Sequence, residues 1–459
     1  MTSMSASAEG AHASSRLYRA VWRWHFYAGL FVVPFLLMLA LTGGYMMLYA
    51  TLSNEMGWVP SVAPKAISVS VSAQGKAAIA ALPGGKLATY IAPEAVNRPA
   101  FFEVSKDDTY YSVAVDPYTG TVLDTHASAD TSRALAEKIH GTFLLGTFGD
   151  RLIEVAASLT IIMAVTGIFL WWPRGEGFPG ALLPRFGNSG RGLWRELHKT
   201  GGIWISLFLI LFVLSGLAWT GIWGDAFVKP WSSFPAAKWD NVPLSDVSHA
   251  SLNHDIMHEV PWTLEATPLP ASGSNAGTPA VSEPVVLDTV VMWALANGFQ
   301  DQFKVAIPGD EKGVFTVSYD GRNEDSVTPA SDRFVHIDQY TGNILADVRL
   351  KDYPFVGKLM AWGIALHKGT AGWWNLAFNL AYLTLVIFAC ISGVVMWWKR
   401  RPAGQLGSPK YPRDYKVPAG ILGLGAVLSV LFPLGGLAVV LFAIIDFLLP
   451  KRLKQAGAQ

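Results

Sequence analysis

Residues 24–48, WHFYAGLFVVPFLLMLALTGGYMML, are an apolar run that begins beside a histidine and carries a Thr-Gly pair near its end. A helix of these 25 residues is long enough to cross the ~30 Å hydrocarbon core of a bilayer. Arg16, Arg19 and Arg23 precede the run, as basic residues do in a signal peptide. The run is too long for a signal peptide, however, and no small-x-small cleavage motif follows it, so we expect a retained span.

A histidine followed by a hydroxyl residue and a glycine occurs four times along the chain. The four motifs are His25 with Thr42-Gly43, His140 with Thr166-Gly167, His198 with Ser215-Gly216, and His367 with Ser392-Gly393. The first and third share an interval of 17 residues; the second and fourth differ by one residue and continue into a Trp-Trp pair. Because an ionisable side chain at a membrane span is unfavourable without a partner, two matched pairs of histidines indicate two ligand sites.

The composition is typical of a membrane protein. Of the 459 residues, 51% are hydrophobic and only 15% are charged, which is apolar for a soluble protein. The net charge of +1 provides no basic field for a nucleic-acid partner, and we expect none. Cys390 is the single cysteine, so the chain has neither an internal disulfide nor a Cys-x-x-Cys-His haem attachment motif.

Lys and Arg in the short flanks of the spans predict the orientation, because cytoplasmic flanks are enriched in them. They lie before the first span, between the second and third, and after the fourth, so both long loops are expected outside. The expected fold class is a membrane α-helical bundle of four main spans plus a C-terminal hydrophobic hairpin, with outer α+β lobes. The predicted segments are span 1 (16–50), outer lobe 1 (51–139), span 2 (140–173), a cytoplasmic loop (174–199), span 3 (200–223), outer lobe 2 (224–360), span 4 (361–398), a second cytoplasmic loop (399–416) and the hairpin (417–449).

The hairpin is inferred from length. Residues 417–449 are mostly apolar, and as one helix they would extend about 50 Å, too long for one comfortable span. The stretch Phe432-Pro433-Leu434-Gly435-Gly436 offers a break near the middle. A break there would return the basic C-terminal residues to the cytoplasm, although a single span stays possible.

The two long loops contain a matched pair of strand–turn–strand motifs. SVAVDPYTGTVL (112–123) and RFVHIDQYTGNIL (333–345) each place Asp and Gly four residues apart between two β runs. That pattern is typical of a hairpin with a Gly-bearing loop. The chain is therefore interpreted as an internal duplication of span, outer lobe and span, residues 1–173 and 190–401. Residues 268–284 are rich in Pro, Ser, Gly and Ala, and we expect a flexible insertion there.

These motifs resemble a known family. Residues 115–122, VDPYTGTV, are similar to the core of a PepSY domain, and the repeated His, Thr/Ser-Gly and Trp-Trp spans resemble PepSY-associated transmembrane proteins. The resemblance covers nearly the whole chain, from about Arg16 to Leu449. That family includes iron-regulated inner-membrane proteins and haem-containing siderophore reductases of Gram-negative bacteria. The resemblance implies a multi-pass protein of the bacterial inner membrane with PepSY-like lobes in the periplasm.

The histidines themselves indicate haem ligation. His25 and His198 are expected at one depth near the cytoplasm, and His140 and His367 at another near the outer face. Two imidazoles facing each other across a helical bundle can supply both axial ligands of a haem, so we expect two b-type haems. Gly29 and Gly202, each four residues after a histidine, would leave room for the macrocycle. Possible propionate contacts are Arg23 and Arg195.

Other roles for the histidines stay open. A non-haem metal site, a proton relay, or simple hydrogen bonds at the membrane interface would also place histidines at span ends. His254 and His258, four residues apart with His249 nearby, are weaker candidates for a metal site. His126 and His336 are interpreted as surface or local hydrogen-bonding residues. Asp150, Arg151 and Glu154 are expected to form an ion pair at the outer face.

Two haems near opposite membrane faces would form an electron path across the bilayer. We expect an oxidoreductase that reduces a ferric siderophore in the periplasm and releases iron as Fe(II). The chain has no flavin or nicotinamide motif, so a quinol or a cytoplasmic flavoprotein must supply the electrons. The alternatives are a haem-free PepSY membrane module with a binding or regulatory role, and an iron-siderophore permease component. The scarcity of polar mid-span residues does not favour transport.

Overall fold

The computed structural model describes residues 2–53, 56–173, 181–233, 241–253, 260, 262–300, 302–319, 329–402, 407 and 417–448. These form two compact units, which are described separately. The helical unit comprises Met1–Thr42, Ile139–Asp225 and Leu380–Gln459, and the sheet unit comprises Gly43–Lys138 and Ala226–Asn379.

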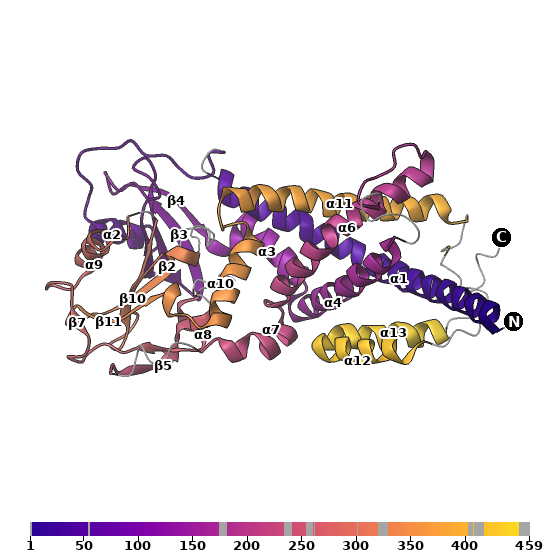
Figure 1. Ribbon diagram of the computed structural model, residues 1–459. Coiled ribbons are helices and arrows are strands. Elements are labelled where there is room, and N and C mark those ends of the chain that lie inside the picture. The colour runs from indigo at the N-terminus through magenta and orange to yellow at the C-terminus, as the bar shows by residue number, and fades with distance from the viewer. Residues whose placement is uncertain are drawn as a thin grey trace. The chain divides into compact units, whose positions relative to one another are not determined.

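Four long apolar helices account for the predicted spans (Figure 1). They are α1 (Thr2–Leu52), α4 (Gly146–Trp171), α6 (Gly190–Leu217) and α11 (Trp373–Arg400). By length and composition, α1 from Arg16 onward and the other three can each cross a membrane. The chain is thus a multi-pass membrane protein. Within the helical unit all four helices contribute to one buried cluster, which includes Val32, Leu159, Leu209 and Val386.

The apolar C-terminal stretch forms two short helices. They are α12 (Ala419–Leu431) and α13 (Pro433–Leu448), and the predicted break coincides with Phe432 between them. Phe432 is buried against Leu217 and Ile161, and its ring stacks on that of Trp223. The break has a local cause, because Pro433 lacks a backbone N–H and favours the first position of a new helix. α13 therefore lies against α4, where an added methyl at Gly435 would meet the Ser158 side chain.

Segments 140–173 and 361–398, each predicted as one span, each contain parts of two helices, and the helix of span 3 is shifted toward the N-terminus. His140 lies on a separate helix, α3 (Ser132–Thr142), which ends before Phe143 and Leu144, both with positive φ. His367 likewise lies on α10 (Phe355–Lys368), which is capped by Gly369 in the left-handed conformation and separated from α11. α6 begins ten residues before the predicted start of span 3, at Gly190, and ends earlier, at Leu217. Hydropathy marks the apolar part of a helix, whereas turn geometry and caps decide where the helix ends.

The two long loops share one antiparallel sheet of nine strands, and are not the two separate lobes that the sequence predicted. The strand order is β4-β3-β2-β1-β8-β9-β10-β11-β7, and β1 pairs with β8 at the centre. The strands are β1 (Lys86–Ile91), β2 (Ala100–Lys106), β3 (Thr109–Val115), β4 (Val122–Ala127), β7 (Thr278–Pro279), β8 (Lys304–Ala306), β9 (Val314–Ser318), β10 (Arg333–Asp338) and β11 (Asn343–Arg349). Separate lobes were expected because nothing local in β1 or β8 identifies its partner strand.

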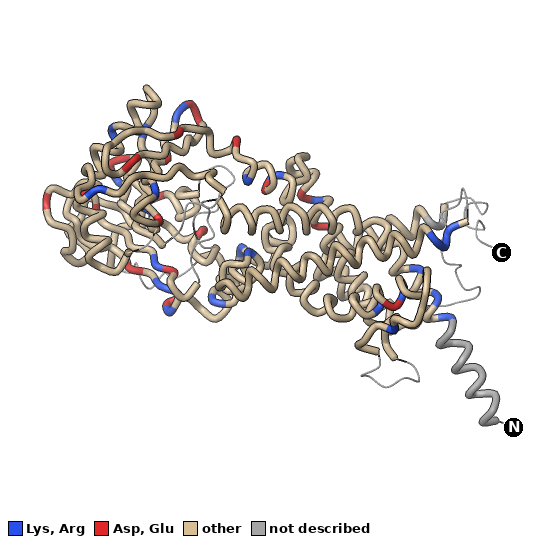
Figure 2. The backbone as a smooth tube through the Cα atoms, turned by 90° about the horizontal axis from the view of Figure 1, so that it is seen from above, with Lys and Arg blue, Asp and Glu red and all other residues tan. Residues whose placement is uncertain are grey.

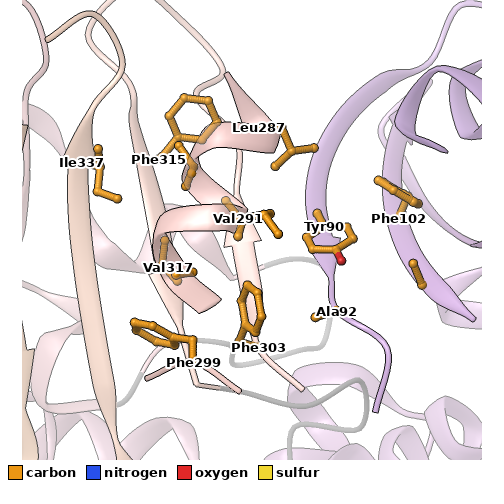
Figure 3. Close-up of a cluster of buried hydrophobic side chains, with 14 of the residues drawn as sticks. Tyr90, Ala92, Phe102, Leu287, Val291, Phe299, Phe303, Phe315, Val317 and Ile337 are labelled. Carbon is orange, nitrogen blue, oxygen red and sulfur yellow. The ribbon is translucent and has the colours of Figure 1, made fainter. Parts of the chain in front are cut away.

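Each half of the sheet has the same order of elements. α2 (Val71–Ala81) precedes β1 to β4, and α9 (Leu287–Ala296) precedes β8 to β11. Both helices cover one face of the sheet, where their apolar residues join the strands in a common core (Figure 3). Within this core the rings of Tyr90 and Phe303 have centroids 6.4 Å apart, so the two halves of the sheet share their hydrophobic burial.

The remaining elements are short. They are η1 (Ser128–Asp130), α7 (Gly221–Phe227), η2 (Lys229–Trp231), β5 (Leu244–Ser248), η4 (His249–Leu252), α8 (Trp262–Glu265), β6 (Pro268–Pro270), η5 (Pro329–Ser331) and η6 (Leu350–Asp352). β5 and β6 pair in a separate two-stranded sheet.

The prediction of a flexible insertion at residues 268–284 was wrong. The segment contains β6 and the edge strand β7, which pairs with β11. Val281 is buried in the main core, and the Gly273 backbone N–H donates a hydrogen bond to the Asp338 carboxylate. A composition rich in Pro, Gly and Ser indicates turns, and here those turns are held by long-range hydrogen bonds.

Candidate cofactor site in the helical unit

His25 on α1 and His198 on α6 lie side by side within the helical unit, with their rings nearly perpendicular. Their ring centroids are 6.5 Å apart and their planes are inclined at 79°. The residues are 173 positions apart in the chain (198 − 25) and come from the starts of two different spans. The two histidines that were paired on the basis of their matched motifs are therefore close in space.

Each imidazole is held through Nδ1 by two oxygen atoms of one neighbouring helix. His25 Nδ1 lies 3.0 Å from the Met163 carbonyl oxygen and 3.1 Å from Thr166 Oγ1 on α4. His198 Nδ1 lies 3.1 Å from the Ala389 carbonyl oxygen and 2.9 Å from Ser392 Oγ on α11. Because a carbonyl only accepts hydrogen bonds, Nδ1 carries the proton in both rings and Nε2 keeps its lone pair.

A glycine follows each of these hydroxyl residues and lies against the ring. A methyl group at Gly167 would come 3.2 Å from His25 Cε1, and one at Gly393 would come 3.5 Å from His198 Cε1. The recurring Thr/Ser-Gly pair is thus explained by contact: the hydroxyl oxygen accepts a hydrogen bond from Nδ1–H and the glycine makes room for the ring. In both cases the histidine and the Thr/Ser-Gly pair that contacts it lie on different helices.

The geometry fits two ligands of one metal ion. Metal–imidazole bonds are about 2 Å long, and each ring centre lies roughly 1 Å further out, so two such rings have centres about 6 Å apart. A ligating histidine usually donates its other N–H to a carbonyl or similar acceptor, as both rings do here. Among the described residues no hydrogen bond involves Nε2 of either ring.

The predicted glycines around this pair differ in their surroundings. A methyl group at Gly202 would meet nothing within 4 Å, which leaves open space beside His198. A methyl group at Gly29 would be in ordinary contact with Met163 Sδ at 3.7 Å. A side chain would therefore find space at Gly202 and would touch Met163 at Gly29.

The two predicted arginines also differ. Arg23 is buried, and its guanidinium lies over the Tyr27 ring at 4.9 Å. Arg195 is largely exposed and lies 3.6 Å from the Glu196 carboxylate. A third arginine, Arg400 at the end of α11, was not predicted here, and its guanidinium lies over the rings of Trp22 and Phe26 on α1. Only folding brings the two helix ends together, so no sequence pattern indicates this neighbour.

The other two histidines fall in different units. His140 Nδ1 lies 2.9 Å from Thr42 Oγ1, so the Thr-Gly pair of α1 holds the histidine that precedes α4. α1 and the α3–α4 segment therefore exchange these contacts reciprocally. His367 lies on α10 in the sheet unit. In the repeated sequence motifs, His367 occupies the place of His140, and Ser215 that of Thr42.

The loop histidines form an unexpected pair. His254 and His258 lie outside the described residues, and the part of the chain that is described contains no group of three or more potential metal ligands. His249, by contrast, lies with its Nε2 3.0 Å from Nε2 of His336, and both side chains are fully buried. His126 and His336 were predicted as surface or local hydrogen-bonding residues. His336 is buried and hydrogen-bonded to Thr316 and His249, and His126 makes a local contact with Asp124.

The ion pair predicted for Asp150, Arg151 and Glu154 is present, and these residues link α4 to α7. Arg151 lies 2.6 Å from Asp150 and 3.8 Å from Glu154. The same two carboxylates accept hydrogen bonds from the backbone N–H groups of Gly221 and Ile222. This cluster satisfies the first N–H groups of α7 and has a structural explanation.

Residues 22–400 match the family described as the PepSY-associated TM region, so the chain belongs to this family of membrane proteins. The resemblance found in the sequence is thereby confirmed. A comparison with curated proteins found no match.

Proposed function

We propose that the chain is an inner-membrane b-haem reductase that carries electrons across the membrane to a ferric siderophore in the periplasm. The observation that supports this best is the pair of imidazoles of His25 and His198. Their ring centroids are 6.5 Å apart, and each Nδ1 is hydrogen-bonded to a carbonyl. His25 and His198 would hold a haem bound there, and the haem would supply a one-electron carrier.

The second haem in the proposal is ligated by His140 and His367. It is supported by the matched motifs and by the contact of His140 with Thr42, which repeats the Thr/Ser contact at the first pair. The same order of elements in the two halves of the sheet supports the proposal that the chain arose by internal duplication. Both haems would be b-type, because the chain has one cysteine, Cys390, and no Cys-x-x-Cys-His motif for haem attachment.

Charge supports the proposed orientation. Lys and Arg gather at the start of α1, the start of α6 and the end of α11, where a cytoplasmic face would have them (Figure 2). The sheet unit is then periplasmic, and its size and polar surface suit a bulky hydrophilic chelate. In the reaction, one electron converts Fe(III) to Fe(II), which binds hard oxygen ligands more weakly and is released. A quinol or a cytoplasmic flavoprotein is the proposed electron donor.

An absorption spectrum of detergent-purified protein from haem-replete cells tests the proposal. We expect a b-type spectrum, about two haems per chain, and complete extraction of the haem by acid acetone. Colourless protein would overturn the proposal and favour a haem-free binding or regulatory module. If one haem per chain is found, the proposed site at His25 and His198 is kept and the second proposed site is dropped.

A further inference from the structure

The hydroxyl groups of Thr166 and Ser392 each donate one hydrogen bond and accept another. Thr166 Oγ1 donates its own proton back along α4 to the Ile162 carbonyl at 2.7 Å, and Ser392 Oγ donates to the Ala389 carbonyl at 2.9 Å. Each oxygen therefore has its lone pairs free to accept from a histidine Nδ1–H. The imidazole proton is shared between this hydroxyl and a carbonyl one turn earlier on the same helix.

Two acceptors and a glycine restrict rotation of each ring. A single acceptor already limits the turn of an imidazole about its Cβ–Cγ bond, because Nδ1 lies off the axis of that bond. The second oxygen, together with Gly167 or Gly393 beside Cε1, narrows the permitted range further. Since His25 is held by α4 and His198 by α11, the two ring planes are set independently, and they lie 79° apart.

We infer that Thr166 and Ser392 are positioning residues that hold the two axial imidazoles of one haem nearly perpendicular. This inference rests on the proposed function. When the two imidazoles are perpendicular, each interacts with a different one of the two iron dπ orbitals. These two orbitals then have almost the same energy. The ferric low-spin state then has a strongly anisotropic electron paramagnetic resonance (EPR) spectrum, with a larger maximal g value than parallel imidazoles produce. Hydrogen bonds to Nδ1–H also make an imidazole a stronger donor, which favours Fe(III) and lowers the reduction potential.

EPR and redox titration of purified variants test this role. The measurements use the His140→Ala background, so that only the haem at His25 and His198 contributes. In Thr166→Val the hydroxyl is replaced by a methyl group of similar size, so the ring of His25 loses one of its two acceptors. We expect stoichiometric haem at this site, a smaller maximal g value or a broadened signal, and a higher midpoint potential. Ser392→Ala should shift both readouts in the same direction.

Two controls distinguish positioning from a general effect on folding. Thr166→Ser keeps the hydroxyl and should restore both the spectrum and the potential of the parent. Thr160→Val makes the same change on α4 at a buried threonine whose hydroxyl donates only to the Ala156 carbonyl, and it should change neither.

The outcomes separate the inference from the proposed function. Parent protein without haem would overturn both. Haem that is present but has a spectrum typical of parallel imidazoles would overturn the inference alone. So would Thr166→Val and Ser392→Ala variants indistinguishable from the parent. If Thr166→Val loses the haem, Ser392→Ala decides the question, because it removes only one oxygen atom.

Discussion

In the imidazoles of His25 and His198, the two ring nitrogens have different roles. Nδ1 is committed to oxygen acceptors on α4 or α11, and Nε2 is left with a lone pair. Two such residues acting on one ligand form a functional unit, and the loss of either one removes the shared site. Effects of mutations within a unit are not additive.

Replacing His25 or His198 by Ala should therefore remove the same haem, about half of the total. The double variant should lose little more than either single variant, because one remaining imidazole binds haem weakly. Haem per protein, measured as the pyridine complex, checks this, with the exposed His126→Ala as the control. If the double variant instead lost both haems while each single variant lost one, the two residues would belong to different sites.

His249 and His336 form a buried chain of hydrogen bonds in the sheet unit. Thr316 Oγ1 donates to His336 Nδ1, His336 Nε2–H donates to His249 Nε2, and His249 Nδ1–H donates to the Thr267 carbonyl. This assignment satisfies every ring nitrogen only when both imidazoles are neutral. Burial lowers the pKa of His249 to about 4, and burial followed by the charge of His249 lowers the pKa of His336 well below its ordinary value.

Acid should therefore destabilise the sheet unit. Both pKa values are lower in the folded state than the ordinary 6.5, so the unfolded chain binds more protons below pH 6.5. The stability that the neutral pair contributes is complete above pH 6.5 and falls by up to about 1.4 kcal/mol per histidine per pH unit toward pH 4. His249→Gln should lower the stability at pH 7 but give a shallower pH dependence between 6.5 and 4.5, measured by thermal unfolding. An unchanged slope would contradict this account.

At the scale of elements, the two Asp-x-Tyr-Thr-Gly turns are equivalent in sequence but not in their surroundings. In both, the Asp carboxylate accepts the backbone N–H of the tyrosine two residues later, and the glycine has positive φ. Gly120 has open surroundings, with Val69 Cγ1 at 3.8 Å from an added methyl group. A methyl group at Gly342 would overlap the carbonyl oxygen of Val281 in the segment 268–284.

Gly342→Ala should therefore destabilise the sheet unit more than its matched control, Gly120→Ala. Both substitutions place a side chain in the left-handed region, at a cost of about 1–2 kcal/mol. Only Gly342→Ala must also displace Val281, which adds roughly 1–3 kcal/mol as overpacking does elsewhere. Resistance of the sheet unit to proteolysis across a urea series measures the difference. Equal losses in the two variants would mean that the 268–284 segment is not held against this turn.

At the scale of the whole molecule, the proposal assigns a direction to electron flow. His25 and His198 lie near the basic ends of α1 and α6. His140 and His367 lie on α3 and α10, the helices that precede α4 and α11. Electrons should therefore enter the protein on the side of the basic residues and leave it on the side of the sheet unit.

Chemically reduced protein in liposomes should be reoxidised by a ferric siderophore added on the side of the sheet unit, with Fe(II) trapped by a chelator. His140→Ala and His367→Ala should slow this reoxidation more than His25→Ala does, because they remove the haem nearest the acceptor. Stopped-flow absorbance records the rates. If quinones reoxidise every form rapidly and no ferric chelate does, the chain is a quinone-linked carrier for another periplasmic acceptor.

Local sequence patterns were sufficient for the four spans, the helix break at Phe432 and the turns that follow Asp116 and Asp338. Each depends on neighbours in the chain: apolar length for a span, a missing N–H at proline, and positive φ at glycine. The segments assigned to spans 2 and 4 began too early, at residues 140 and 361, because the turns that separate α3 from α4 and α10 from α11 were not recognised. The single nine-stranded sheet was also missed, since the pairing of β1 with β8 is a contact between segments more than 200 residues apart.

The candidate site divides in the same way. The sequence alone identified the histidines and matched His25 with His198, because ionisable residues stand out against apolar runs and their spacing repeats. Only the tertiary structure decided that Thr166 and Ser392 hold these rings, and that His249 meets His336. A motif shows which residues recur, but a hydrogen bond depends on which helix or strand lies beside another. That choice is made by the burial of whole helix faces and sheet edges, which no local stretch of sequence contains.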